Sequence, residues 1–166
     1  MPTIQKIFCD PTPALRFIGK RYFEVGGHWG EWFANGWFDT IETAMGGTDK
    51  ITAIWENGGG YVGLEIRTSD SFAYMIGMFT PANTPIPDGF EAIDFNGVSL
   101  GTCWIYGKEN EVHETSGCRE KLEEAGYELW TDADGAVYSF ENCLCPRYTT
   151  PDENGNVILD YCYVIK

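Results

Sequence analysis

The 166-residue sequence contains no hydrophobic run close to the 18 residues that a membrane-spanning helix needs. Its first ten residues, Met1 to Asp10, also lack the basic start, apolar core and small-residue cleavage site of a signal peptide. We therefore expect a cytoplasmic protein that makes no use of a membrane.

Positive charge is scarce as well. Lysine and arginine together number 11 against 25 aspartates and glutamates, which gives a formal net charge of -14 at pH 7. A field of that sign repels the phosphates of nucleic acids and the headgroups of anionic lipids. The balance argues against direct nucleic-acid binding and is compatible with a cationic or neutral partner.

Histidine is limited to His28 and His113, which restricts the catalytic and metal-binding motifs that the chain can hold. Neither belongs to the paired histidines of a zincin helix, and no Ser-His-acid arrangement stands out. Cys143 and Cys145 are separated by one residue, which is too close for a zinc knuckle. We expect no metal and no cofactor, and cysteines that stay reduced and pack as small hydrophobic side chains.

The chain has many hydrophobic residues that can form a core. Hydrophobic residues make up 43% of it and aromatic residues 15%, including six tryptophans. A chain of 166 residues can bury a sizeable core, so we expect a single domain over 1–166.

The order of predicted elements repeats. Two halves, at about 14–80 and 89–165, flank a proline-rich segment at 81–87. Hydrophobic periodicity and turn residues predict strands at 14–23, 51–56, 61–68, 72–79, 90–95, 100–106, 137–145 and 157–165, and helices at about 30–44 and 109–125. The expected fold class is α+β: two strand–helix–strand–strand units that form one antiparallel sheet with two main helices on one face.

Each predicted helix has an apolar stripe at helical spacing. The first carries Phe33, Trp37, Ile41 and Ala44, and the second carries Val112, Cys118, Leu122 and Ala125. Gly126 follows the second stripe, where a left-handed glycine commonly ends a helix.

A carboxylate, Glu141, interrupts the apolar segment 137–145. Residues two apart share one face of a strand, so Glu141 lies with Ser139 and Cys143 on the face of small side chains. Burying a charge is costly unless it is paired, and the strand contains no basic residue. A ligand is therefore a candidate for the missing partner.

Several short motifs resemble one known family. They are Tyr-Met-Ile-Gly-Met at 74–78, Ile-Pro-Asp-Gly-Phe-Glu at 86–91, Thr-Cys-Trp-Ile-Tyr at 102–106, Ala-Gly-Tyr at 125–127 and Phe-Glu at 140–141. From about Ala14 to Ile165 the chain resembles the GyrI-like effector-binding domain. The resemblance implies tandem β-α-β-β repeats with a ligand pocket between the halves. In multidrug-sensing regulators of the MerR and AraC classes that pocket takes flat lipophilic cations onto aromatic side chains around a central glutamate, and Glu141 stands at its position.

Those bacterial regulators carry a DNA-binding domain, whereas only about thirteen residues precede the first predicted strand here. The chain therefore resembles a standalone member of the family. Standalone members include drug-sequestering proteins, gyrase inhibitors and hydrolases that open the cyclopropane ring of DNA-alkylating natural products.

Five aromatic residues are candidates to line the pocket with Glu141. Trp104 and Tyr106 share one face of the strand at 100–106, Phe33 and Trp37 lie on the stripe of the first helix, and Tyr161 belongs to the last strand. Aromatic faces around a desolvated cation attract it. The alternative is that each of these side chains packs in an ordinary core.

Two functions remain open. The first is a binding module that captures lipophilic, cationic aromatic small molecules. The second is a hydrolase on the same pocket, in which Glu141 orients or deprotonates a water and Tyr106 polarises the leaving oxygen of an electrophilic substrate. Inhibition of a topoisomerase ranks behind both, and the sequence leaves the oligomeric state open.

Overall fold

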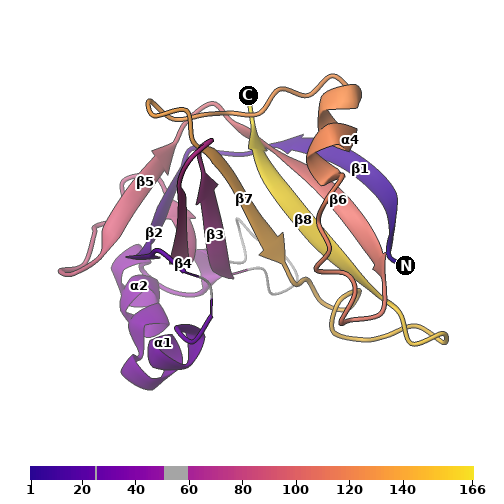
Figure 1. Ribbon diagram of the computed structural model, residues 1–166. Coiled ribbons are helices and arrows are strands. Elements are labelled where there is room, and N and C mark those ends of the chain that lie inside the picture. Colours follow the sequence, from indigo (N-terminus) through magenta and orange to yellow (C-terminus); the bar gives the residue numbers. More distant parts are fainter. Residues whose placement is uncertain (25, 51–59) are drawn as a thin grey trace.

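The computed structural model describes residues 1–24, 26–50 and 60–166. Within them the chain forms eight strands and three helices (Figure 1). In chain order these are β1 (Thr3–Pro11), β2 (Leu15–Tyr22), α1 (Trp29–Asn35), α2 (Trp37–Met45), β3 (Tyr61–Arg67), β4 (Phe72–Pro81), β5 (Glu91–Phe95), β6 (Ser99–Gly107), α4 (Cys118–Glu124), β7 (Val137–Asn142) and β8 (Val157–Ile165).

All eight strands join one antiparallel sheet in the order β1-β6-β8-β7-β3-β4-β2-β5. The order is symmetric about the β7–β3 boundary. On one side lie β6, α4, β7 and β8, and on the other lie β2, α1–α2, β3 and β4, with β1 and β5 as the outer strands. The predicted α+β fold of tandem β-α-β-β repeats on an antiparallel sheet is confirmed.

Two short connections force this sheet to curl. β1 and β2 are six strand spacings apart in the sheet order, which is roughly 29 Å in a flat sheet. The chain from Pro11 to Leu15 can span only about 14 Å. The connection from Phe95 to Ser99 joins β5 and β6 across the same number of spacings, and the Thr12 N–H donates to the Val98 carbonyl at 3.2 Å. The two halves therefore bend toward each other.

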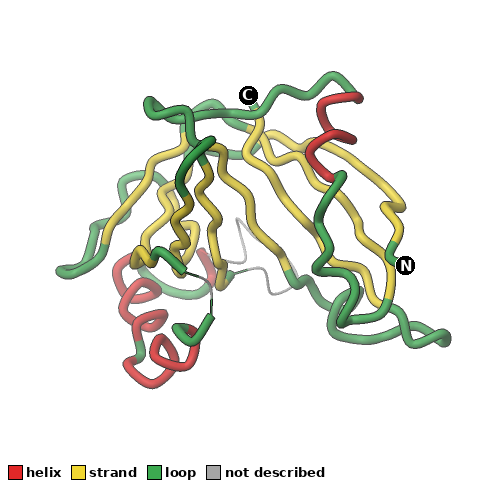
Figure 2. Tube along the Cα trace, viewed as in Figure 1, coloured by secondary structure: helices red, strands yellow, loops and turns green. Residues whose placement is uncertain are grey.

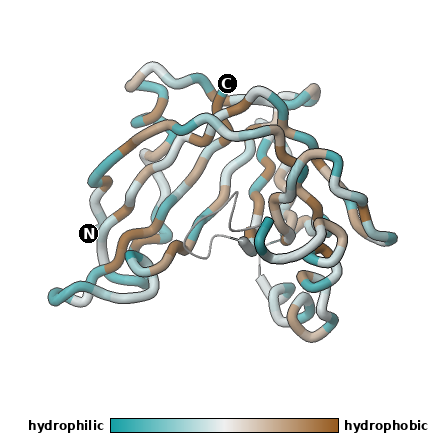
Figure 3. Tube along the Cα trace, turned by 180° about the vertical axis from the view of Figure 1, so that it is seen from behind, coloured by the Kyte–Doolittle hydropathy of each residue, from teal (hydrophilic) through white to brown (hydrophobic). Residues whose placement is uncertain are grey.

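Bending gives the sheet an inner face and a helix face. The inner face holds a core drawn from both halves, including Phe17, Phe79, Leu100, Phe140 and Val164. Long stretches of the strands are hydrophobic when the molecule is seen from behind (brown in Figure 3). On the helix face, α1 and α2 pack on one half and α4 packs on the other, and the strands between them run uncovered by a described helix (Figure 2).

The predicted helix at 30–44 is two helices. Gly36 adopts a left-handed conformation with φ of 64° and ends α1, and α2 begins at the next residue. This break changes the helical phase, so the predicted apolar stripe is wrong. Of that stripe only Ile41 is buried, and the other buried side chains of the two helices are Trp32, Phe38 and Met45.

The second helix is shorter than predicted. Gly117, with φ of 90°, precedes α4, and residues 109–113 form turns. Three residues of its predicted stripe, Val112, Cys118 and Leu122, are fully buried, whereas Ala125 is exposed at the end of α4. Gly126 has the predicted positive φ, of 92°.

Three further differences concern strands. β1 was not predicted, and β7 ends at Asn142 instead of residue 145. The predicted strand at 51–56 lies outside the described residues. In the described part of the chain, no helix is long and apolar enough to cross a membrane.

Candidate ligand-binding groove

A groove of about 310 Å³ opens on the helix face where the two halves meet. Its floor comes from the central strands β3 and β7, with β4 beside them. We call it the central groove, and it is lined by Trp29, Tyr61, Gly63, Glu65, Tyr74, Glu141, Asn142 and Cys143. The groove thus combines three aromatic side chains with two carboxylates.

Glu65 is the more enclosed of the two carboxylates, with 22% of its side chain exposed. Its Oε2 accepts hydrogen bonds from the Tyr161 hydroxyl at 2.8 Å and from Ser139 Oγ at 3.4 Å. Arg67 approaches the same oxygen at 3.5 Å. Burial raises the pKa of Tyr161, so its phenol stays protonated and keeps Glu65 in place as a hydrogen-bond acceptor.

Glu141 departs from the expectation of a buried charge without a protein partner. Its side chain is 37% exposed, and Oε1 lies 2.9 Å from Nδ1 of His113. The other ring nitrogen of His113 lies 3.3 Å from the Tyr148 hydroxyl. The expectation failed because β7 ends one residue after Glu141, and because the partner comes from the segment before α4, 28 residues away in sequence.

Aromatic side chains from the first half form the opposite wall. Trp29 Nε1 donates to the Tyr74 hydroxyl at 3.3 Å. The Tyr61 ring stacks on Phe38 with ring centroids 4.0 Å apart, and its hydroxyl donates to Glu42 at 2.6 Å. Burial and the neighbouring Glu42 raise the pKa of Tyr61 to about 12, so the phenol is neutral in water near pH 7.

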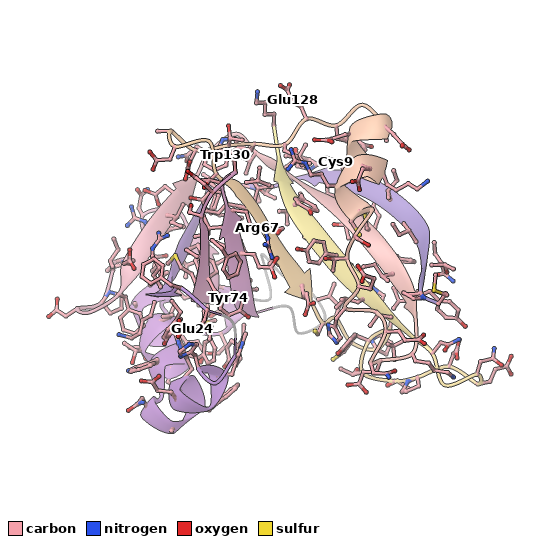
Figure 4. All side chains as sticks on the ribbon, in the orientation of Figure 1. Cys9, Glu24, Arg67, Tyr74, Glu128 and Trp130 are labelled. Carbon is pink, nitrogen blue, oxygen red and sulfur yellow. The ribbon has the colours of Figure 1, made fainter. Side chains whose placement is uncertain are left out.

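Arg67 and Tyr74 both project from the helix face (Figure 4). Arg67 lies over the ring of Phe72, 4.6 Å from its centroid, and is itself 58% exposed. Its positive charge is therefore at the solvent edge of the groove, where water screens it. The two carboxylates lie deeper along the floor.

Cys143 completes the lining beside Glu141. Burial, then the nearby Glu141 charge, raises the pKa of this thiol to about 11. A thiol with that pKa is almost entirely protonated at pH 7, and the thiolate is the nucleophilic form. Cys143 therefore contributes a neutral side chain to the groove.

The structure brings only part of the predicted site together. Glu141 lines the central groove, and Tyr161 reaches it through its hydrogen bond to Glu65. Trp104 and Tyr106 do not lie there. In the sheet register Trp104 pairs with Asp160 and Tyr106 with Ile158, which places both on the inner face.

Phe33 and Trp37 also lie outside the groove lining. Phe33 is 61% exposed, with its ring 6.5 Å from Trp29 and 6.1 Å from Tyr61, so it stands beside the aromatic wall. Trp37 packs against Trp32 and the ammonium of Lys20. The left-handed Gly36 between the two helices separates these side chains from the common stripe that was expected.

The residues that sequence reasoning missed are Glu65, Trp29, Tyr61, Tyr74 and His113. Glu65 sits in a strand whose odd-numbered residues look like an ordinary polar face, because Val62, Leu64 and Ile66 alternate with it. The sequence feature that could have indicated a site here is the placement of Gly63 and Glu65 on the same face of one predicted strand. Nothing in the sequence indicated that His113 belongs to the site, since only the fold brings it beside Glu141.

Metal binding is not supported by side-chain clustering. In the described ranges no group of three His, Cys, Asp or Glu residues is arranged to hold a metal ion. Each of the six cysteines is a free thiol.

Comparison with known proteins identifies the fold. No family model and no curated protein matches the sequence. Among solved structures, a Staphylococcus aureus MU50 protein named as a candidate for bacterial transcription regulation is 14% identical with a TM-score of 0.55, over 97% of this chain and 98% of that one. A structure of SAV2435 bound to tetraphenylphosphonium is 15% identical with a TM-score of 0.50, over 98% and 94%. A hydrolase from Listeria innocua is 13% identical with a TM-score of 0.51, over 98% and 93%.

These matches cover nearly the whole of each chain, so the fold is shared from end to end. At such low sequence identity the matches show a shared fold and nothing about a shared function. The proteins that share the fold are one named for transcription regulation, one observed with tetraphenylphosphonium, and one named as a hydrolase.

Proposed function

We propose that this protein binds lipophilic aromatic cations in the central groove and sequesters several such molecules by the same means. The observation that carries the proposal is the pairing of two carboxylates, Glu65 and Glu141, with the aromatic wall of Trp29, Tyr61 and Tyr74. Of the site residues predicted from sequence, Glu141 and Tyr161 remain in the proposal.

The physical basis is electrostatic. Each aromatic face near a desolvated cation contributes roughly 0.5–2 kcal/mol, and carboxylates in a partly closed groove attract positive charge more strongly than they would in bulk water. The net charge of -14 adds a long-range field of the same sign. A volume of about 310 Å³ is at the lower end of ligand pockets, which run from about 300 to 1,000 Å³. The groove therefore suits a compact ligand or the inner part of a larger one.

The likeness to a protein bound to tetraphenylphosphonium supports the ligand class. The test uses a pair of molecules of nearly the same shape: methyltriphenylphosphonium, which is cationic, and triphenylphosphine oxide, which is neutral. Quenching of tryptophan fluorescence, to which Trp29 in the groove contributes, should give an affinity for the cation at least about tenfold higher than for the neutral molecule, which corresponds to ~1.4 kcal/mol. Equal affinities would remove the proposal's electrostatic basis.

Hydrolysis of an electrophilic small molecule is the second candidate. The observation that favours it is the hydrogen-bonded series Glu141, His113 and Tyr148 at the groove edge, which could hold and activate a water. Tyr106, expected to polarise the leaving oxygen, donates to Asp152 and lies on the inner face, so Tyr74 would have to take that part. Conversion of a strained electrophile that stops in Glu141→Gln would favour this candidate over binding alone.

A further inference from the structure

A second cavity, of about 280 Å³, lies on the inner face of the curled sheet. The β1–β2 connection at Pro11–Pro13 forms one side of it, and β6, β8 and the end of β7 form the other. Its apolar walls include Phe8, Leu100 and Leu144. We call it the inner cavity. The central groove lies across the thickness of the sheet, on the opposite face.

The buried charges of the inner cavity already neutralise each other. Asp160 is 3% exposed and accepts two hydrogen bonds from Arg147, at 2.6 Å from Nε and 2.7 Å from Nη2. Trp104 Nε1 donates to the same carboxylate at 3.3 Å, and the Arg147 guanidinium lies 4.9 Å from the Trp104 ring centroid. The pair is satisfied, so it gives no preference for a ligand of either charge.

Asn142 is different, because its side-chain carboxamide has no hydrogen-bond partner among the described residues. Asn142 is in the lining of both the central groove and the inner cavity, but it is 5% exposed and pairs with Asp160 in the register, which places its side chain on the inner face. Within the residues that the structure describes, no group hydrogen-bonds its side-chain oxygen or nitrogen. A buried polar group left unpaired destabilises the folded state, so a ligand or water that pairs with Asn142 in the cavity would be favoured.

A second polar group nearby is only weakly satisfied. Thr102 is 5% exposed, and in the described part of the chain its hydroxyl contacts only the sulfur of Cys162 as a hydrogen-bond partner, at 3.5 Å. Asp10, which is exposed, lines the mouth and adds negative charge there. A ligand in the inner cavity would therefore meet the adjacent donor and acceptor of the Asn142 carboxamide and the hydroxyl of Thr102. The walls around it are apolar, and the entrance is acidic.

We propose that the inner cavity is a second binding site, for a small neutral molecule with a planar cis-amide, such as a lactam ring. A cis-amide presents N–H and C=O side by side, so it can donate to the Asn142 side-chain oxygen and accept from the Asn142 NH₂ in one plane. The rest of the ring system lies against Leu100 and Leu144. Anions are repelled at Asp10, and cations find no unpaired carboxylate inside.

The size of the cavity limits the ligand to one or two rings. Water in the liquid occupies about 30 Å³ per molecule, so 280 Å³ corresponds to roughly nine waters. Ordered water is the alternative occupant, and the experiment must separate the two.

The probe is 2-quinolone, a flat lactam, with 1-methyl-2-quinolone as the control that lacks the N–H. Titration of isotopically labelled protein should shift the Asn142 side-chain NH₂ signals and the Thr102 amide signal. The methylated control should bind at least about tenfold more weakly. Asn142→Leu should abolish 2-quinolone binding and raise Tm by about 2 °C or more, because it removes an unpaired buried amide.

Leu144→Trp provides the matched variant, since a large side chain there fills the inner cavity from the loop after β7. It should abolish 2-quinolone binding and leave methyltriphenylphosphonium binding unchanged. Glu141→Gln should weaken methyltriphenylphosphonium binding and leave 2-quinolone binding unchanged. The two variants therefore test the inner cavity and the central groove separately, and the loss of one binding activity can be observed while the other is retained.

Three results would overturn the proposal. The first is the absence of any Asn142 side-chain shift with 2-quinolone at millimolar concentration, which would leave the cavity to water. The second is equal binding of the two quinolones. The third is displacement of 2-quinolone by methyltriphenylphosphonium, which would place it in the central groove.

Discussion

Tyr74 lies directly against the backbone of Gly63, in a position that a β-carbon on residue 63 would occupy. The two residues are on neighbouring strands of the same face, and Gly63 has no unusual backbone conformation that would by itself require glycine. Its role is therefore to make room. Without a side chain at 63, the Tyr74 phenol can lie across β3, receive the Trp29 hydrogen bond and form the aromatic wall of the central groove.

Replacing Gly63 with alanine should displace the Tyr74 ring. We expect affinity for methyltriphenylphosphonium to fall at least about fivefold, because one aromatic contact of roughly 0.5–2 kcal/mol is lost. Fluorescence titration measures the change. Gly30→Ala is the control: Gly30 lies in α1 with open space around its α-carbon, so it should bind the cation as the wild type does. An unchanged affinity in Gly63→Ala would show that Tyr74 does not contact the ligand.

His113 should compete with the ligand for Glu141. It holds Glu141 Oε1 at 2.9 Å, so its removal leaves that carboxylate free for a cation. We expect His113→Ala to raise cation affinity by about two- to fivefold, because a side-chain hydrogen bond between partly exposed groups contributes only about 0.5–1.5 kcal/mol. His28→Ala, which removes the partner of Glu24 on the first half, serves as the control. A lower affinity in His113→Ala would mean that His113 positions Glu141 for binding.

Cys143 should respond to pH as a thiol with a raised pKa. Its pKa of about 11 lies above the ordinary value of about 8.5, so the thiolate fraction should rise about tenfold per pH unit between pH 8 and pH 10. Alkylation by iodoacetamide, followed at this residue by mass spectrometry, should show the same slope without a plateau. Saturating methyltriphenylphosphonium should slow the reaction. A plateau by pH 9, or no protection by the cation, would contradict the placement of Cys143 in the groove.

Arg147 should be important for stability. Removing it in Arg147→Met leaves the buried Asp160 carboxylate without its cation, and breaking such a pair costs about 3–5 kcal/mol. Urea denaturation measures the free energy of unfolding. The double variant Arg147→Met with Asp160→Leu removes both charges and should recover most of the loss. A single variant as stable as the wild type would show that Asp160 is not held in a low-dielectric site.

Much of the fold could be predicted because strand patterns and turn residues are local properties. Alternation placed β2, β3, β4, β6 and β8 within a few residues, and the repeated order of elements gave the sheet its symmetry. The helices were less accurate. Gly36 and Gly117 interrupt apolar patterns that continue through them, and only the backbone shows that each takes a left-handed conformation.

The site was harder to predict because both faces of this sheet carry packed hydrophobic side chains. Alternation correctly grouped Trp104 with Tyr106 and Glu141 with Ser139, but it cannot tell which group faces the helices. In the structure the first pair lies on the inner face and the second on the helix face. The contribution of Glu65 and His113 depends on strand order and on a long loop, and neither is encoded in local spacing.

The most direct test of cation binding in the central groove is the charge dependence of affinity in the double variant Glu65→Gln with Glu141→Gln. Both substitutions keep the shape of the floor and remove its charge. Affinity for methyltriphenylphosphonium should fall about a hundredfold, which corresponds to ~2.8 kcal/mol, and affinity for triphenylphosphine oxide should be unchanged or higher. Equal weakening of both molecules, or of neither, would contradict the account.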